Sequence, residues 1–383
     1  MINPYITSIC GKRRATWFQI ESTGGDTVVA TTLISGDYIY IQGSTTATSL
    51  GGDATGGGTN LFVTKRKKSD FTKVWMKFYA VTGVNGGQNL EIFDTDKLVF
   101  VAQISSSSPK LYTINMLDGA TVGTPLDLDI ATSTITAAYN IQKSSSYYWV
   151  VGYRYIGSYD SVVWRLDLAD LGNLTVFPFN VGGNEGFLYS VISTDGNYLQ
   201  VYERATATQK LFGLSTGTPT ALGSIIATYT LMSKICDSSN TKWMMHLGKT
   251  DLSSRTIHRS IISNISVGGT YNHDLGSFLA TDKIGDMKFI GSYFYGLFYD
   301  STTGTLIVTR YDDSDVYGAG GTPTTITPDT IDTAGNITVN THSFIDFDGT
   351  QGLLITTMEG KIDAGATASG NYDIVIKLFD LPS

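Results

Sequence analysis

A short sequence pattern recurs seven times along the chain, and this repetition constrains the fold more than any other feature. Each copy has a turn residue (Gly, Asp, Asn or Ser) followed by a short aromatic and aliphatic run. The runs begin at Tyr38, Lys97, Tyr147, Asn197, Lys242, Tyr293 and Gln351, with a mean spacing of about 52 residues. This spacing is near the repeat length of about 40–50 residues that is typical of β-propeller blades.

Each copy contains further strand-like pieces around that run. An apolar stretch precedes the turn, as in TVVATTLIS (27–35), and a third stretch follows a polar loop, as in SVVWRLDL (161–168). A weaker fourth stretch follows in several copies, as in KVWMKFYAV (73–81). Many of these pieces alternate apolar and polar residues, which is the pattern of a half-buried strand. Four strands in each of seven copies predict an all-β chain, folded as a seven-bladed β-propeller of four-stranded antiparallel blades.

The composition agrees with short strands and turns. Gly contributes 42 residues and Tyr 22, and Ser and Thr are abundant. These residues favour strands and turns and disfavour helices. The composition therefore argues against a helical bundle, a coiled coil and an enzyme built from βαβ units. Hydrophobic residues make up 42% of the chain, which is enough to bury a large core.

The two ends of the chain suggest how the ring closes. The seventh copy has no fourth stretch, while TWFQIES (16–22) is a spare strand-like segment before the first copy. We expect residues 16–22 to form the outer strand of the last blade. The expected organisation is an N-terminal arm at residues 1–15 and a single propeller domain at residues 16–383.

The first copy resembles the bacterial β-propeller repeat often called SBBP. The matching pieces are IYIQGST (39–45), which is similar to the "IYVTGST" strand of that family, and LFVTK (61–65), which follows a Gly-rich loop. The later copies keep the spacing of strands and turns but do not contain these motif residues. The resemblance implies a repeat scaffold that is often found in surface or secreted proteins, and it implies no shared catalytic residues.

The charge balance argues against nucleic acid as a partner. The net charge is −8 and only 16% of the residues are charged, whereas a phosphate-binding surface needs concentrated Lys and Arg. The one dense basic run is Lys65-Arg66-Lys67-Lys68. Charge runs are usually solvated, so we expect a solvated turn there.

The cysteines and the apolar runs do not identify the cellular compartment of the protein. Cys10 and Cys236 lack zinc-site spacing, and either a disulfide between them or two free thiols fits the sequence. No apolar run approaches the ~20 residues that cross a bilayer, and the N-terminus does not read as a signal peptide. The composition, poor in Lys and Glu and rich in Ser, Thr, Gly and Asn, favours an extracellular or cell-surface protein.

No catalytic motif stands out. His246, His258, His273 and His342 have no metal-site spacing, and we expect structural roles for them. We therefore expect no catalytic residues, no metal site and no cofactor. The Asp286 and Asp346 carboxylates are expected on inner strands, without an assigned acid or base role.

Two loop segments have structural rather than functional interpretations. YDDSDVYGAGG (311–321) resembles a calcium loop, but Thr324 stands where a bidentate Glu is needed, so an acidic turn is expected. GGDATGGG (51–58) lacks the ending of a phosphate loop and is expected to be a flexible loop between two strands.

The sequence also contains three N-glycosylation acceptors, and many aromatic residues near the start of the second strands. The acceptors are Asn173, Asn264 and Asn336, all expected in outer strands or loops where a glycan could be carried. The second-strand aromatics are expected to pack between blades. The residues concerned are Tyr38, Tyr40, Tyr147, Tyr148, Trp149, Trp243, Tyr293, Phe294 and Tyr295.

These observations favour a non-catalytic β-propeller scaffold that makes protein–protein contacts, as a repeating subunit of an extracellular or cell-surface assembly. Two alternatives stay open. One is a carbohydrate-binding propeller, which would need exposed Trp or Tyr at loop tips. The other is a hydrolase or lyase with its site at the mouth of the channel, where His246 or His342 would contribute.

Overall fold

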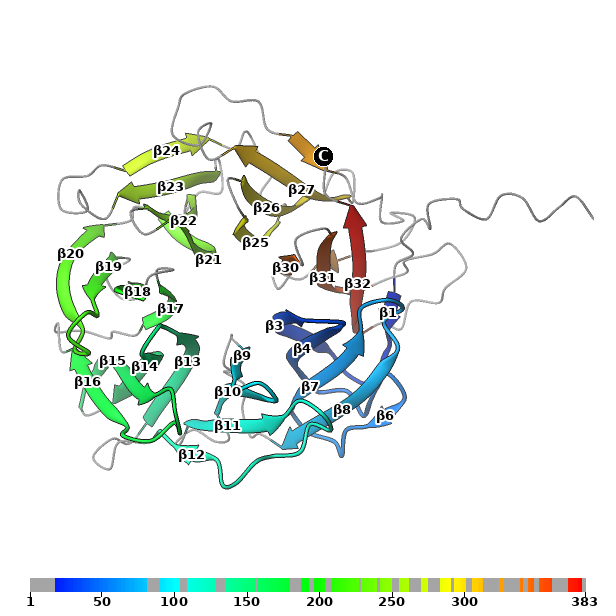
Figure 1. Ribbon diagram of the computed structural model, residues 1–383. Helices are drawn as coiled ribbons and strands as arrows, with labels where there is room; N and C mark the ends of the chain where they lie inside the picture. The colour runs from blue at the N-terminus through cyan, green and yellow to red at the C-terminus, as the bar shows by residue number, and fades with distance from the viewer. Residues whose placement is uncertain are drawn as a thin grey trace, which may run out of the picture.

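The computed structural model is built from β-strands arranged around a common centre (Figure 1). It describes residues 18–80, 90–103, 109–128, 135–155, 157–179, 187–192, 196–203, 208–226, 229–239, 242–249, 255–261, 270–274, 283–290, 293–300, 305–312, 324–326, 338–339, 344–347, 351–359 and 371–380. Within these residues there are six four-stranded sheets, one five-stranded sheet and one three-stranded sheet. We name the seven larger sheets I to VII in chain order.

The first four sheets each contain four strands that lie side by side in chain order. Sheet I contains β3 (Thr27–Ser35), β4 (Tyr38–Thr45), β7 (Asn60–Lys67) and β8 (Lys73–Ala80). Sheet II contains β9 (Leu90–Phe93), β10 (Lys97–Gln103), β11 (Pro109–Asn115) and β12 (Leu126–Asp127). Sheet III contains β13 (Ile135–Lys143), β14 (Tyr147–Tyr155), β15 (Tyr159–Asp167) and β16 (Thr175–Phe179). Sheet IV contains β17 (Phe187–Ile192), β18 (Tyr198–Glu203), β19 (Thr208–Gly213) and β20 (Thr220–Ile226).

The remaining sheets follow in chain order around the same centre (Figure 1). Sheet V contains β21 (Tyr229–Ser239), β22 (Lys242–Lys249), β23 (Arg255–Ile261) and β24 (Thr270–Asp274). Sheet VI contains β25 (Lys283–Ile290), β26 (Tyr293–Asp300), β27 (Thr305–Asp312) and β28 (Thr324–Ile326). Sheet VII contains β29 (Thr338–Val339), β30 (Phe344–Phe347), β31 (Gln351–Glu359), β32 (Tyr372–Asp380) and β1 (Phe18–Ile20). The small sheet contains β2 (Ser22–Thr23), β5 (Ser49–Leu50) and β6 (Asp53–Ala54).

The predicted all-β fold with antiparallel four-stranded sheets is confirmed. Each of the seven sequence repeats supplies the strands of one of the larger sheets, and neighbours within each sheet pair in the order that the repeats predict. In six of these sheets the four strands lie side by side in chain order and pair antiparallel, and in sheet I β5 and β6 of the small sheet lie between β4 and β7 in the chain.

The second strands read as apolar runs because both of their faces are buried. In β4, Ile39 and Ile41 pack into a cluster shared with sheet VII, and Tyr40 packs into a cluster shared with sheet II. In β14, Tyr148 and Trp149 likewise face sheets II and IV respectively. A strand with both faces covered gains from apolar residues at every position rather than at alternate ones. The prediction that these aromatics pack between blades is confirmed for the buried members of the set.

A glycine on the second strand allows the inner strand to approach closely. The pairing of β3 with β4 shifts register between Val29 and Thr31, which is a β-bulge. A Cβ atom on Gly43 would overlap the Val28 carbonyl oxygen next to this bulge. Gly152 of sheet III is constrained in the same way by the Ala137 carbonyl oxygen. The glycine of the IYIQG run is therefore required by backbone contact.

The N-terminal strand pairs with the last strand of the chain. Residues Phe18 to Ile20 run antiparallel to β32, with Ile20 opposite Ile374. The buried carboxylate of Asp373 accepts hydrogen bonds of 2.6 Å from Gln19 Nε2 and from the Ser22 backbone N–H. The pairing agrees with the strand expected at 16–22 over residues 18–20. Residues 16–17 lie outside the described part of the chain, and Ser22 instead enters the small sheet.

Two sequence interpretations near this junction were wrong. The run Lys65-Arg66-Lys67-Lys68 is not a solvated turn, because its first three residues lie in β7 and the side chains of Lys65 and Arg66 are buried. The segment 51–58 is not simply a flexible loop, because Asp53–Ala54 forms β6. Both errors arise because the segments are read by residue type. In the structure, Lys65 of β7 contacts sheet II and Arg66 contacts sheet VII, while β6 pairs within the small sheet.

Candidate functional site

Three sheets carry the same stack of a cationic side chain on a tyrosine ring. The tyrosine begins the second strand, and the cation lies two residues before the end of the third strand. The distances from cation to ring centroid are 3.9 Å for Lys65 on Tyr38, 4.6 Å for Arg165 on Tyr147 and 4.5 Å for Arg310 on Tyr293. A cation within about 6 Å of a ring centroid is attracted by the ring electrons. Because the position is the same in each sheet, the stack is a property of the repeat.

In sheet I the stacked cation also binds the neighbouring sheet. Lys65 Nζ donates a 2.9 Å hydrogen bond to the Met116 carbonyl oxygen, and Trp75 Nε1 donates to the same oxygen at 3.2 Å. Tyr79 donates from its hydroxyl to the Gly119 carbonyl oxygen at 3.1 Å. Burial lowers the pKa of Lys65. These three donors fix the turn between β11 and β12 against the outer half of sheet I.

Sheet III repeats this contact with sheet IV. Arg165 donates from Nη1 to the carbonyl oxygen of Gly217, in the turn between β19 and β20, and from Nη2 to Thr175 Oγ1 at 3.1 Å. The guanidinium also lies 5.7 Å from the centroid of the Phe177 ring. At two seams, therefore, the cation of one sheet holds the third-to-fourth turn of the next sheet through a backbone carbonyl.

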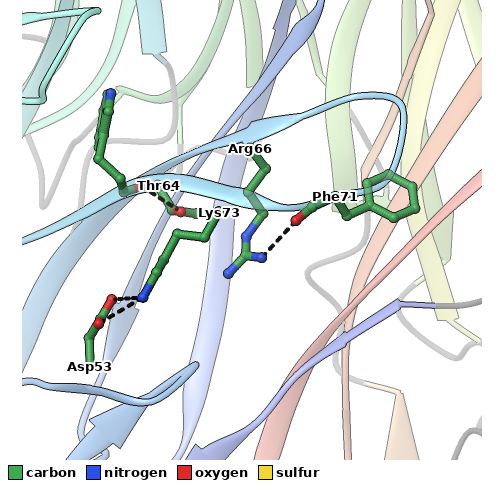
Figure 2. Close-up of polar contacts among 6 residues, drawn as sticks. Asp53, Thr64, Arg66, Phe71 and Lys73 are labelled. Carbon is green, nitrogen blue, oxygen red and sulfur yellow. Dashed lines mark hydrogen bonds and ion pairs between the residues drawn. The ribbon is translucent and has the colours of Figure 1, made fainter.

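Arg66, the neighbour of Lys65, points to the other face of sheet I. Its Nη1 donates a 2.9 Å hydrogen bond to the Phe71 carbonyl oxygen (Figure 2), and its guanidinium lies 5.3 Å from the Phe18 ring centroid. Burial lowers the pKa of Arg66 to about 10, partly offset by the nearby Asp53 carboxylate. Asp53 itself forms an ion pair with Lys73 at 2.7 Å. Arg66 therefore links the turn after β7 to the N-terminal strand β1.

Buried tyrosines act as neutral hydrogen-bond donors between sheets. Burial, with a smaller effect of Tyr38, raises the pKa of Tyr40 to about 12. Burial also raises the pKa values of Tyr79 and Tyr148. The Tyr148 hydroxyl donates to the Ile92 carbonyl oxygen at 2.7 Å. These phenols stay protonated at neutral pH, so each can donate to a backbone carbonyl of an adjacent sheet.

The most exposed large hydrophobic residues of the described part lie mainly on the outer rim of the ring. Val74 lies on the outer strand β8, Leu117 and Val122 lie between β11 and β12, and Leu222 lies on the outer strand β20. Tyr293, which carries the stack of sheet VI, is the fifth. Leu117 is 76% exposed, the largest value of the five.

The turn that carries Leu117 is well ordered by its own hydrogen bonds. The backbone N–H of Leu117 donates to Asn115 Oδ1 at 2.8 Å, and that of Gly119 donates to the Asn115 carbonyl oxygen at 2.8 Å. Asp118 accepts a 2.9 Å bond from the Ala120 backbone N–H. The leucine is therefore presented to solvent on a fixed backbone.

A second candidate surface is a cluster of four half-buried tyrosines in sheet III. The ring centroids of Tyr153 and Tyr159 are 5.2 Å apart in an edge-to-face contact, and those of Tyr155 and Tyr159 are 4.9 Å apart. Tyr139 of the inner strand lies 5.7 Å from Tyr153. The sequence reasoning did not single out this cluster. Its signal is the spacing of Tyr153 and Tyr155, which places both on one face of β14.

Of the three candidate glycosylation sites, the structure describes only one. Asn173 lies in the exposed turn between β15 and β16, with φ of 51°, and its Nδ2 donates to Asp167 Oδ2 at 2.6 Å. Asn264 and Asn336 lie outside the described residues. Glycosylation at these three positions stays a prediction.

Of the polar residues considered for a channel site, only Asp346 has a side chain that the structure describes. His246, His258 and His273 lie on three different strands of sheet V, and His342 lies outside the described residues. Asp346 Oδ2 accepts a 3.1 Å bond from the Ile34 backbone N–H, so it links the inner strands of sheets VII and I. Asp286 lies on β25.

The remaining sequence-based candidates stay open. Cys236 lies on β21 and Cys10 outside the described residues, so their pairing stays untested. Residues 313–321 of the acidic stretch at 311–321 also lie outside the described residues. Among the described residues, no group of three His, Cys, Asp or Glu side chains is placed to hold a metal ion. That part of the chain also contains no helix long and apolar enough to span a membrane.

No family model matches the sequence, and no curated protein matches it closely enough to report. Solved structures do resemble the fold. The WD40 domain of Neurospora crassa Pan2 has a TM-score of 0.56 and 10% identity, with 96% of each chain covered. The β-propeller domain of the trilobed protease from Pyrococcus furiosus has a TM-score of 0.51 and 8% identity, covering 94% of this chain and 98% of that one. The Cps50 (Swd1) propeller domain of Myceliophteria thermophila has a TM-score of 0.51 and 9% identity, covering 96% and 100%.

At such low identity these likenesses speak for the fold alone. They agree with sheets of antiparallel strands arranged around a centre, and with the repeat length of the sequence. The resemblance of the first repeat to the bacterial SBBP repeat has no matching family model and stays a prediction. The chain is an all-β protein with the β-propeller fold.

Proposed function

We propose that residues 16–383 form a single seven-bladed β-propeller, preceded by an arm at residues 1–15, with sheets I to VII as its blades. The pairing of β1 with β32 supports closure of the ring between its first and last sheets. The cluster that joins Ile39 and Ile41 of sheet I to Leu353 and Ile355 of sheet VII supports it further.

The propeller acts as a non-catalytic scaffold that makes protein–protein contacts through its outer rim. The observation that carries this proposal is the set of exposed apolar residues on outer strands and on third-to-fourth turns, with Leu117 the most exposed. Exposed apolar side chains on a fixed backbone favour binding, because little conformational entropy is lost when they are covered. The propeller likeness of the Pan2 WD40 domain agrees with a scaffold role.

The scaffold is a repeating subunit of an extracellular or cell-surface assembly. The low content of charged residues, 16%, supports this setting, as does the large share of Gly, Ser and Thr. Glycans at Asn173, Asn264 or Asn336 would be compatible with it. Proteins, including further copies of the chain, are the proposed partners, and nucleic acid is not.

Replacing Leu117 with Asp should raise the dissociation constant for self-association at least tenfold. The substitution places a carboxylate where an apolar side chain would be buried, which costs about 2 kcal/mol or more. Sedimentation velocity over a concentration series measures the effect. Ser215→Asp is the matched control, because Ser215 is exposed at the corresponding position of the turn in sheet IV. Wild-type protein that stays monomeric at the highest concentrations would remove self-assembly from the proposal.

A carbohydrate-binding propeller is the second candidate, and the tyrosine cluster of sheet III favours it. Four rings offer apolar faces and hydroxyl groups in one place, and sugars need both kinds of contact. On a glycan array we expect wild-type binding to fall at least tenfold in Tyr159→Ala and to persist in Tyr198→Ala, a tyrosine of sheet IV outside the cluster. An array on which the wild-type protein binds nothing would eliminate this candidate.

A further inference from the structure

The tip of the hairpin between β14 and β15 holds two tyrosine rings against each other. Tyr155 ends β14 and Tyr159 begins β15, and the two residues lie directly opposite each other in the strand register. Directly opposite residues of an antiparallel pair have Cβ atoms about 4.5–5.5 Å apart. The two ring centroids are 4.9 Å apart, the shortest distance between tyrosine rings among the pairs that the structure describes.

Two further tyrosines extend this pair into a continuous row of phenol rings. The ring centroid of Tyr153 lies 5.2 Å from that of Tyr159, and the ring centroid of Tyr139 lies 5.7 Å from that of Tyr153. Electrons pass readily between phenol rings at such separations. An electron removed from any ring of the row is therefore replaced from its neighbours, and the unpaired electron reaches the pair at the hairpin tip.

The hairpin pair is also nearer to solvent than the comparable pair in the core. Gly157, in the turn between the two strands, is exposed, and Tyr155 and Tyr159 are half-buried. By contrast, Tyr79 and Tyr112 have ring centroids 5.5 Å apart within the apolar cluster between sheets I and II, where Tyr112 is buried. A dissolved oxidant therefore reaches the hairpin pair more easily than the core pair.

We propose that Tyr155 and Tyr159 are a modification site, at which hydrogen peroxide and a haem peroxidase form a dityrosine cross-link. Each phenol loses one electron and one proton from its hydroxyl group, and the peroxide takes up both electrons and both protons to give water. The two phenoxyl radicals couple through a carbon–carbon bond between a Cε atom of each ring. The hydrogen atom on each of these carbons then moves to the phenol oxygen, which restores both hydroxyl groups.

The fold contributes the proximity that this coupling needs. Two groups held in contact react as if each were present at a very high local concentration, and the strand register holds these two rings together. The product is a covalent bridge across the tip of the hairpin, with a net loss of two hydrogen atoms from the pair. The inference goes beyond the proposed scaffold function and does not depend on it.

Oxidation of the purified full chain by hydrogen peroxide and a haem peroxidase, followed by trypsin digestion, tests the cross-link. Trypsin cleaves after Arg154 and Arg165, so both tyrosines of the pair fall in the single peptide 155–165. We expect this peptide to lose the mass of two hydrogen atoms and to show dityrosine fluorescence. A link to Tyr153 would instead join it to peptide 144–154, and that joined product as the main one would overturn the assignment.

Variants at the two strand ends and elsewhere show which ring reacts. Tyr155→Phe keeps the ring but removes the hydroxyl hydrogen, so the total dityrosine fluorescence should fall at least fivefold. Tyr198→Phe, which changes a tyrosine of sheet IV outside the cluster, is the matched control and should react like wild type. Equal fluorescence from the Tyr155 variant and wild type would contradict the proposal.

The core pair serves as an internal control for the folded state. A link between Tyr79 and Tyr112 would join the tryptic peptides 78–97 and 111–143, and we expect at least tenfold less of it than of the hairpin product. A comparable yield of both products would show that the reaction passes through the unfolded chain, and an unmodified peptide 155–165 would show that the pair does not couple. Either result overturns the proposal and leaves the scaffold function untouched.

Discussion

Deleting residues 1–22 should lower the free energy of unfolding by about 5 kcal/mol. The deletion exposes the surface that the buried Ile20 side chain covers, a loss of about 2 kcal/mol. It also removes both hydrogen bonds that Gln19 and Ser22 make to the buried Asp373 carboxylate, and bonds to charged groups contribute roughly 1.5–3 kcal/mol each. Thermal and urea unfolding of the full chain and the truncated chain measure the difference.

Deletion of residues 1–15 is the matched control, because it removes the arm and keeps β1. This shorter truncation should unfold like the full chain. In the intact chain, Asp373→Ala should reproduce part of the loss, since it leaves the Ser22 backbone N–H without its carboxylate partner. If both truncations unfold at the same temperature, the strand at 18–20 does not close the ring.

Arg66→Ala should lower the free energy of unfolding by about 3 kcal/mol. The substitution leaves the Phe71 carbonyl oxygen without the Arg66 donor, and an unpaired buried acceptor costs about 1–3 kcal/mol. It also empties a buried volume and removes the stack on Phe18, and the lost packing adds to that cost. Phe71, whose carbonyl oxygen accepts this bond, has a φ of 59°, in the left-handed region that a phenylalanine rarely adopts. Urea unfolding with several probes gives the value.

The control for this change is on the same strand. Lys67, which is exposed at the end of β7, should tolerate replacement by Ala with a loss below about 0.5 kcal/mol. Arg66→Met should cost less than Arg66→Ala, because it fills the site without burying a charge. If Arg66→Ala lowers the free energy of unfolding no more than Lys67→Ala does, the buried guanidinium does not stabilise the fold.

The repeats predicted the strands well, because each strand in this fold is marked locally by a turn residue and a short apolar run. A turn residue and a run such as YIYIQG identify a second strand in any copy, whatever its partners are. The buried cations were missed because Lys65 and Arg66 read as solvent-facing by residue type. Their burial depends on sheets II and VII, whose contributions come from residues more than 40 positions away in the chain, such as Met116. The burial of Lys65 and Arg66 therefore becomes visible only when the positions of the neighbouring sheets are known.

The tyrosine cluster is a second case in which sequence spacing does not reveal the contacts between strands. Tyr153 and Tyr155 have a spacing that predicts one face of a strand, but their contact with Tyr139 depends on the bulge in β13 between Ala138 and Asn140. In sheet III this bulge brings the Ala137 carbonyl oxygen so close to Gly152 that a Cβ atom would not fit there. Sequence spacing predicts which side chains share a face, whereas the bulge decides which inner residue joins them.

The seams between sheets I to IV have a consequence for how this part of the chain unfolds. Each seam has an apolar cluster and a side-chain donor that binds a backbone carbonyl oxygen of the neighbouring sheet: Lys65 joins sheets I and II, Tyr148 joins II and III, and Arg165 joins III and IV. In repeat proteins a weak interface sets the boundary of a cooperative unit, and each of these three seams has both kinds of contact. We therefore expect the amide protons of sheets I to IV to exchange together, as one cooperative unit.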